Sequence, residues 1–304
     1  MRNQPGHVGR HAGRSLTLAA IVLLLAAGCG RGEFDGESAY SFLVEQCSFG
    51  PRPPGTEAHR RTRDWLVERL RETTDHVALQ RFVVTAPGGE FELTNIIASF
   101  APRKRERVLL GTHWDTRAIA ERDPDPANRA TPIIGANDGA SGTAVLLELA
   151  HMMALRAPRI GVDLVFFDGE DGGNGGGLGE WCLGSKHYAR HLGDYCPSYA
   201  VVIDMIGDAD LAVHVEPNSA TACPEVVERV WGAASRVGAT RFDREFGVAV
   251  YDDHAPLIRA GIPAALVIDL EYPSWHTVED TPDKCSPGSL AEIGRVLTEL
   301  VYGP

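Results

Sequence analysis

The stretch Gly161-Val-Asp-Leu-Val-Phe-Phe-Asp-Gly-Glu-Asp171 is a short apolar run that ends in a cluster of acids. Near-continuous apolar runs bounded by polar residues are typical of strands buried on both faces of a largely parallel sheet. In open α/β sheets, ligands bind outside the carboxyl ends of the strands. The stretch therefore predicts a buried strand whose acidic end faces a site.

The same pattern recurs along the chain and alternates with helical patterns. Apolar strand-like runs cover residues 107–113, 199–206 and 264–268, and two further strands, 77–84 and 91–100, flank the turn Pro87-Gly-Gly89. Helices are expected at 56–70, 141–155, 184–192, 224–237, 254–260 and 289–302, the last with Ser289 as its N-cap. This order predicts an α/β fold, with a mixed, largely parallel central sheet flanked by helices. No linker is visible within 41–304, so we expect a single domain there.

The composition is that of an ordinary globular protein, with 304 residues, 44% hydrophobic and 23% charged. The net charge of −12 gives no electrostatic footprint for nucleic acid. It also argues against binding an anionic membrane through the protein's own surface. We therefore expect no nucleic-acid partner.

The N-terminus has the features of a targeting segment. Arg10 and Arg14 precede an apolar run over residues 16–27, which is too short to span a bilayer. Small residues then precede Cys29, as in a bacterial lipobox, although the position three before the cysteine is Ala26 and not the more usual Leu. We expect a lipoprotein-type signal peptide at 1–28, lipidation of Cys29, a linker at 29–40, and attachment in the bacterial periplasm or cell envelope by the lipid alone. A plain secretory signal is the alternative.

Cysteines are sparse in the remainder of the chain. Five follow Cys29, and none shows the Cys-x-x-Cys spacing of a thiolate metal site. An exported compartment permits disulfides, and the sequence leaves open whether Cys182 and Cys196 pair.

Polar clusters recur after the apolar runs and could converge on one pocket. They are His113-Trp-Asp115, Asn137-Asp138, Asp168-Gly-Glu-Asp171, Asp204, Asp252-Asp-His254 and Trp275-His276. Each cluster alone has a simpler explanation, such as a turn, a helix cap or a core aromatic. Together, Asp, Glu and His without Cys suit a Zn²⁺ site with an open position for substrate. Burying unpaired carboxylates is costly, which also favours a metal.

These motifs, in this order, resemble those of a known family. His113-Trp-Asp-Thr-Arg117, Ile134-Gly-Ala-Asn-Asp-Gly-Ala140, Phe166-Phe-Asp-Gly-Glu-Asp171, Trp181-Cys-Leu-Gly-Ser-Lys-His187, Asp204-Met-Ile-Gly-Asp208, Asp252-Asp-His-Ala-Pro256 and Trp275-His-Thr277 look like those of glutaminyl-peptide cyclotransferases. That family belongs with the co-catalytic zinc aminopeptidases. The resemblance runs from about Gly50 to the C-terminal helix.

The resemblance implies a role for each matching position. Asp138, Asp171 and His276 match zinc ligands, and Glu170 matches the general acid/base. Other positions match carboxylates that hydrogen-bond around the site (Asp204 and Asp252) and an aromatic that lines the substrate pocket (Trp275).

Two departures from the family pattern concern one loop. The second ligand is Asp171, where the animal enzymes have Glu, so the metal shifts by roughly one methylene. The animal enzymes also carry an aromatic in the following loop, where an ungapped count gives Gly176. The glycine-rich loop 172–179 is therefore where the pocket is least defined, and Trp181 has no assigned role.

The predicted function is conversion of N-terminal glutamine of peptides or proteins to pyroglutamate with release of ammonia, using one zinc ion. The alternative is a di-zinc aminopeptidase on the same fold, in which His113 and Asp204 would join a bridging Asp138 on a second zinc. Aminopeptidases usually show Ser where this chain has Asp252 and lack a Trp at position 275, which favours the cyclase. A lipid-anchored binding protein without activity is a third possibility. We expect a monomer.

Overall fold

The computed structural model describes residues 33–304 together with Met1 and Gly6. The signal peptide predicted at 1–28 and the lipidation site Cys29 thus fall, apart from Met1 and Gly6, outside the described residues. Residues 33–304 belong to one compact unit. Within the described residues, no helix is both long and apolar enough to cross a membrane.

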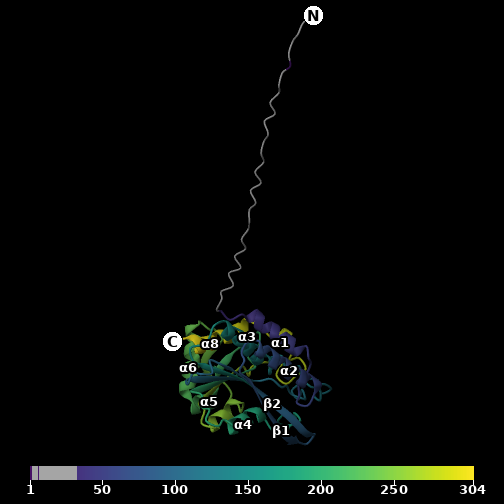
Figure 1. The fold of residues 1–304 in the computed structure, drawn as a ribbon. Helices are drawn as coiled ribbons and strands as arrows, with labels where there is room; N and C mark the ends of the chain where they lie inside the picture. The colour runs from purple at the N-terminus through teal and green to yellow at the C-terminus, as the bar shows by residue number, and fades with distance from the viewer. Residues whose placement is uncertain (2–5, 7–32) are drawn as a thin grey trace. The chain divides into compact units, whose positions relative to one another are not determined.

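A six-stranded sheet forms the centre of this unit (Figure 1). Its strands, in spatial order, are β1 (Val77–Ala86), β2 (Gly89–Phe100), β4 (Gly161–Phe167), β3 (Arg107–His113), β5 (Tyr199–Asp204) and β8 (Ala264–Ile268). β1 and β2 form an antiparallel hairpin, and β2 also pairs antiparallel with β4. The pairs β4–β3, β3–β5 and β5–β8 are parallel. The predicted mixed, largely parallel sheet is confirmed.

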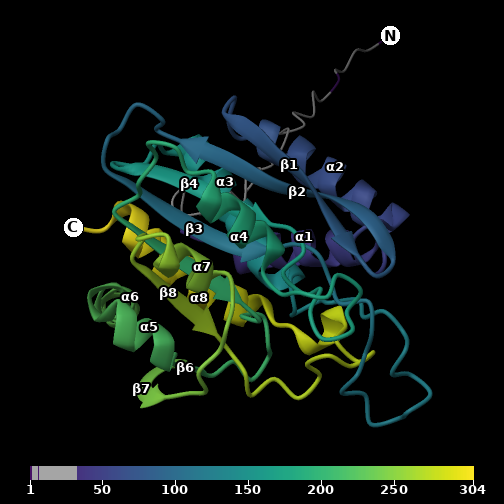
Figure 2. The ribbon, with the colours of Figure 1, turned by 90° about the horizontal axis from the view of Figure 1, so that it is seen from below.

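Helices cover both faces of the sheet. One layer contains α1 (Gly36–Cys47), α2 (Glu57–Arg71), α3 (Ala140–Leu155), α6 (Pro224–Arg236) and α8 (Pro287–Tyr302). The other face carries α4 (Leu183–Arg190) and α7 (His254–Arg259), as Figure 2 shows from below. The remaining elements are α5 (Pro217–Ala222), the 3₁₀ turn η1 (Pro282–Lys284) and a two-stranded parallel ribbon of β6 (Val213–Val215) and β7 (Phe242–Phe246).

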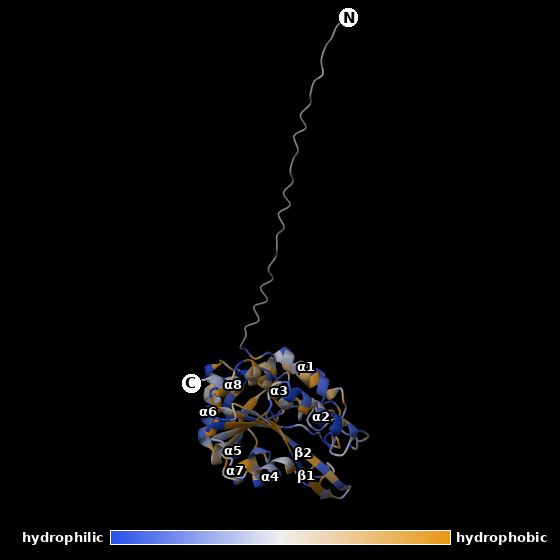
Figure 3. Ribbon diagram, in the orientation of Figure 1, coloured by the Kyte–Doolittle hydropathy of each residue, from blue (hydrophilic) through white to orange (hydrophobic). Residues whose placement is uncertain are grey.

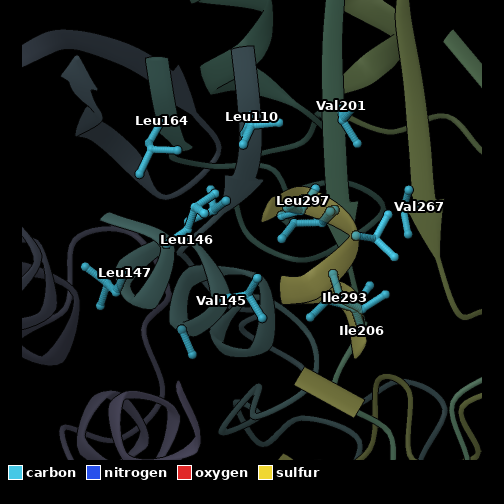
Figure 4. Packing of buried hydrophobic residues seen from close by; sticks show 14 of the residues in the cluster. Leu110, Val145, Leu146, Leu147, Leu164, Val201, Ile206, Val267, Ile293 and Leu297 are labelled. Carbon is cyan, nitrogen blue, oxygen red and sulfur yellow. The ribbon is translucent and has the colours of Figure 1, made fainter. Parts of the chain in front are cut away.

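Strands β3, β4, β5 and β8 are buried on both faces, because their successive side chains point to opposite layers and both layers are covered. Leu110 and Leu164 face α3 and α8 in the larger core, where they join Leu146 and Leu297 (Figure 4). Their neighbours Leu109 and Val165 face the smaller core beneath α4 and α7. Colouring by hydropathy shows a mainly hydrophobic central sheet flanked by helices that contain both hydrophilic and hydrophobic residues (Figure 3). The apolar runs in the sequence follow directly from this two-sided burial.

The structure corrects the predicted linker at 29–40. Residues 36–40 form the first turns of α1, and Asp35 caps this helix by accepting hydrogen bonds from the backbone of Glu37 and Ser38. α1 packs against α3 and α8, and Ser38 donates a 2.6 Å hydrogen bond to Glu148 of α3. The helix depends on this packing, since its own sequence is weakly amphipathic.

The predicted N-cap of the last helix is also wrong. Ser286, not Ser289, caps α8 by accepting a 3.1 Å hydrogen bond from the backbone N–H of Gly288. Ser289 lies inside the helix, where its hydroxyl donates to the carbonyl of Asp208. Proline is favoured in the first turn of a helix, and here Pro287 occupies N1 and places the cap directly before it.

All five cysteines of the described region are free thiols. Cys182 is buried and Cys196 is exposed, and the two do not pair with one another.

Candidate active site

The chemistry-bearing side chains gather at the carboxyl edge of the parallel strands. His113 and Asp204 are the last residues of β3 and β5. Glu170 and Asp171 follow β4, and Gly169 turns the chain toward them with a φ of +72°, a conformation that glycine adopts without strain. The parallel strands thus bring together residues that lie far apart in sequence.

The loops above this edge supply the other members. Asp138 lies just before α3, Asp252 just before α7, and Trp275 and His276 follow β8. Together they surround a cavity of about 210 Å³. It is lined by Asp138, Glu170, Asp171, Trp181, Asp204, Met205, Val250, Tyr251, Asp252, Ile268, Leu270, Trp275 and His276. All residues predicted for the site except His113 line this cavity, and His113 lies directly behind it against Asp138 and Asp204.

Asp138, Asp171 and His276 have the arrangement of a metal centre. One ligand atom from each lies within 4.8 Å of the other two, and all three residues are buried. Nε2 of His276 is 3.5 Å from Oδ2 of Asp138 and 3.5 Å from Oδ1 of Asp171. Within residues 33–304, Oδ2 of both aspartates is buried without a hydrogen-bond partner. Buried carboxylate oxygens left unpaired are costly, so this donor set fits a divalent cation such as zinc.

Two further aspartates hold the ligand-bearing loops by their backbones. Asp280 accepts hydrogen bonds from the backbone N–H groups of Asn137 (2.8 Å) and Asp138 (3.1 Å). Asp115 accepts from those of Glu170 (3.1 Å) and Asp171 (3.3 Å). The sequence placed Asp115 in a polar cluster without assigning it this role, and Asp280 was missed. In the sequence, only the position of Asp280, four residues after His276, indicates that it lies near the site.

Glu121 orients the ring of His276. Its Oε1 lies 2.8 Å from Nδ1 of His276, which leaves Nε2 facing the two aspartates. Burial alone would raise the pKa of Glu121, but hydrogen bonds from His276 and Arg117 hold this pKa at about 2. The carboxyl group therefore stays ionised. A carboxylate behind a histidine ligand fixes the ring and strengthens it as a ligand. His276 itself has a φ of +55°, a strained value for a residue with a β-carbon.

Glu170 is the strongest candidate for moving a proton. It is buried, and its Oε1 accepts a 3.2 Å hydrogen bond from the thiol of Cys182. Burial, followed by the nearby charge of Asp252, raises the pKa of Glu170 well above its usual value. Burial and the charge of Asp204 raise the pKa of Asp252 to about 7. A carboxyl group with a raised pKa beside a metal centre is suited to both accept and donate a proton.

His113 bridges two carboxylates. Its Nε2 is 3.1 Å from Oδ1 of Asp138 and 3.1 Å from Oδ1 of Asp204. Ligand atoms of these three residues also lie within 4.8 Å of one another, so they form a second group able to hold a metal.

Two tryptophans wall the cavity beside His276. The ring of Trp275 is 4.6 Å from that of His276, and the ring of Trp181 is 6.2 Å away and nearly parallel to it. The sequence left Trp181 unassigned, and the structure places it in the cavity wall.

A mixed α/β sheet with a buried carboxylate–histidine cluster suited to a metal ion at its carboxyl edge, and a buried glutamate beside it, is typical of the class of zinc aminopeptidase-like enzymes. The family model of peptidase family M28 matches residues 95–301. The chain belongs to this family.

Named relatives extend the comparison. The chain is 28% identical over 280 residues to the glutaminyl-peptide cyclotransferase of Drosophila melanogaster, covering 81% of this chain and 76% of the relative. It is 34% identical to a solved Bacteroides thetaiotaomicron glutaminyl cyclase, with a TM-score of 0.85 over 90% of this chain and 99% of that one. A zinc-dependent exopeptidase from Parabacteroides distasonis is 35% identical, with the same TM-score and coverage. The resemblance to glutaminyl-peptide cyclotransferases found in the sequence is confirmed.

Proposed function

We propose that this protein is a zinc-dependent glutaminyl-peptide cyclotransferase, which converts N-terminal glutamine to pyroglutamate and releases ammonia. One observation carries the proposal: Glu170 and Asp252 face the same small cavity, and two tryptophans wall it next to the metal centre. The reaction needs a proton carrier, a group that orients the substrate's amine, and an apolar wall. Glu170, Asp252 and the two tryptophans are suited to these three roles.

The metal centre would be formed by Asp138, Asp171 and His276. Zinc held there would supply Lewis-acid polarisation of the glutamine γ-carbonyl and stabilise the charge that develops on its oxygen. One ion is sufficient for this role.

Glu170 would carry the proton. It accepts a proton from the substrate's α-ammonium group, which frees the amine nitrogen to attack the carbonyl carbon of the side-chain amide. The bond between this carbonyl carbon and the amide nitrogen then breaks. Glu170 returns its proton to the leaving nitrogen, and the second proton lost by the attacking nitrogen passes to solvent, so that ammonia leaves. Asp204 and Asp252 would orient the amine, and their negative charges keep Glu170 basic.

The cavity walls favour an intramolecular reaction. Attack within one residue requires that the glutamine side chain be folded back, and positioning of this kind contributes much of a rate enhancement. Trp181 and Trp275 would hold the folded side chain and exclude water, which would otherwise compete with the amine.

A di-zinc aminopeptidase remains the second candidate. The group formed by His113, Asp138 and Asp204 could hold a second metal, and Asp138 would then bridge two ions. Similarity to a structure named as a zinc-dependent exopeptidase supports this candidate as well.

A paired assay separates the two functions. The purified protein is tested for ammonia release from a glutamine-initiated dipeptide and for hydrolysis of an aminoacyl anilide, each before and after chelation and zinc re-addition. Ammonia without anilide cleavage, restored by about one zinc per chain, supports the cyclase. Anilide cleavage without ammonia, restored only by about two zincs, would show that the protein is an aminopeptidase.

We also propose, from the sequence alone, that the protein is exported and attached to the bacterial cell envelope through a lipid on Cys29. The test is incorporation of labelled palmitate in the native protein and in Cys29→Ser. Label in the native protein only supports attachment, and an unlabelled native protein rejects it.

A further inference from the structure

Arg117 is a fully buried cation in the loop after β3, and it contacts three parts of the active site at once. Its Nε donates to both carboxylate oxygens of Glu121, at 2.9 and 2.7 Å. Its Nη1 donates to the carbonyl (3.1 Å) and the carboxylate (3.3 Å) of Asp171 and to the carbonyl of Gly173 (3.1 Å). Its guanidinium carbon also lies 4.6 Å from the centre of the Trp181 ring.

These contacts connect two metal-binding side chains to one another. Asp171 is contacted directly, and His276 is held through Glu121, whose Oε1 lies 2.8 Å from Nδ1 of the histidine. A guanidinium offers several donors in a rigid plane, so fixing one contact fixes the others. The relative placement of Asp171 and His276 therefore depends on one side chain.

The same side chain supports the wall of the cavity. Trp181 lines the cavity, the guanidinium of Arg117 stacks over its ring, and the ring is nearly parallel to that of His276. A cation over an indole face is attractive, and the attraction is stronger where water is excluded.

The glycine-rich loop explains how the contacts fit. A β-carbon on Gly173 would overlap the indole of Trp181. A β-carbon on Gly176 would lie 2.8 Å from Nη1 of Arg117 and 2.6 Å from the carbonyl oxygen of Asp171. Both positions therefore require glycine for packing, which accounts for part of the glycine content of the loop 172–179.

We propose that Arg117 is a positioning residue that couples the metal centre to the cavity wall, acting on His276 through Glu121 and on Trp181 through direct stacking. The coupling does not depend on which reaction the site catalyses. It predicts that zinc affinity and the exposure of Trp181 change together when Arg117 is replaced. It also predicts that only the zinc affinity changes when the contact through Glu121 is broken, and that only the exposure of Trp181 changes when the Trp181 contact is broken.

The test uses zinc and acrylamide as the only probes, so it is independent of any substrate. The zinc dissociation constant is measured by competition with a chelator. Acrylamide quenching of Trp181 is taken as the difference from Trp181→Phe in the same background, because Trp275 is also partly exposed.

Three variants separate the branches. Glu121→Gln should raise the zinc dissociation constant by about tenfold to a hundredfold and leave Trp181 quenching native. Gly173→Ala should increase Trp181 quenching and leave the zinc constant close to native. Arg117→Met should change both. The matched control is Arg244→Met, which removes an exposed Arg–Glu pair with Glu228 away from the cavity and should change neither.

Other results would overturn the proposal. If Arg117→Met changes only one quantity, or neither, Arg117 does not couple the two parts. If thermal unfolding of the zinc-free protein shows that Arg117→Met does not fold, Arg117→Lys replaces it. Lysine retains the charge but cannot reproduce the planar set of donors that holds Glu121 and Asp171 together, so the zinc dissociation constant and Trp181 quenching should both rise. A lysine variant with native Trp181 quenching would contradict the proposal.

Discussion

Replacing Glu170 with Gln tests the proton-transfer role most directly. Glutamine has the same shape, and its oxygen can still accept the hydrogen bond that Cys182 donates at 3.2 Å, so the side chain should stay in place. It cannot take up the proton that the buried carboxyl group, with its raised pKa, is suited to carry. General acid–base catalysis contributes about 10²- to 10⁴-fold, so kcat should fall by this factor, which corresponds to about 3–5 kcal/mol in the activation barrier.

The assay follows ammonia release from a glutamine-initiated dipeptide, with zinc content measured on the same sample. Glu170 is not part of the Asp138–Asp171–His276 group, so Glu170→Gln should keep its zinc. The comparison variant Asp171→Asn should lose zinc and activity together. Turnover by Glu170→Gln above about a tenth of native would refute the role of Glu170. Loss of zinc in this variant would show that the residue supports the metal instead.

Three further predictions concern stability. Burial alone would raise the pKa of Glu216, but the His254 ring 3.4 Å away and hydrogen bonds donated by Asn218 and Ser219 hold it at about 2, below its ordinary 4.5. A carboxyl group whose pKa is lowered in the folded state stabilises the protein at pH values above its ordinary pKa, and this stabilisation is lost as the pH falls. Urea unfolding should therefore show Glu216→Gln to be less stable than the native protein at neutral pH. The difference in the free energy of unfolding should close between about pH 4.5 and about pH 2. A constant gap would contradict this. Leu146→Ala in the main core should cost about 2–5 kcal/mol in the free energy of unfolding, and a loss below about 1 kcal/mol would mean that the cavity collapses. Ser286→Ala should cost about 1 kcal/mol by urea unfolding, because it removes the cap of α8, and an unchanged midpoint would argue against that cap.

The sequence by itself determined the fold class and the edge at which the site lies. Apolar runs ending in acids, such as 161–171, are typical of strands buried on both faces, and parallel strands present their carboxyl ends together. These are local patterns, so they can be recognised without knowing how the chain packs. The ordered motifs then identified the family, which the match over residues 95–301 confirms.

Helix α1 was not predicted, because it is stabilised by tertiary contacts and not by a local pattern. Its sequence has a weak apolar face, and it is stable because it packs on α3 and α8. Gly36 shows how close this packing is, since a β-carbon there would overlap the carbonyl of Pro287 in α8.

Only the tertiary structure revealed the residues that support the site. Arg117 and Glu121 lie in a loop whose composition is typical of an exposed segment, and Asp280 resembles a surface acid. Glu121 meets His276 across 155 residues of sequence, and Arg117 meets Asp171 across 54. Apolar periodicity is a local property of the chain and predicts elements, whereas the partner of a polar side chain is fixed only when packing excludes water and leaves it a single neighbour to bond.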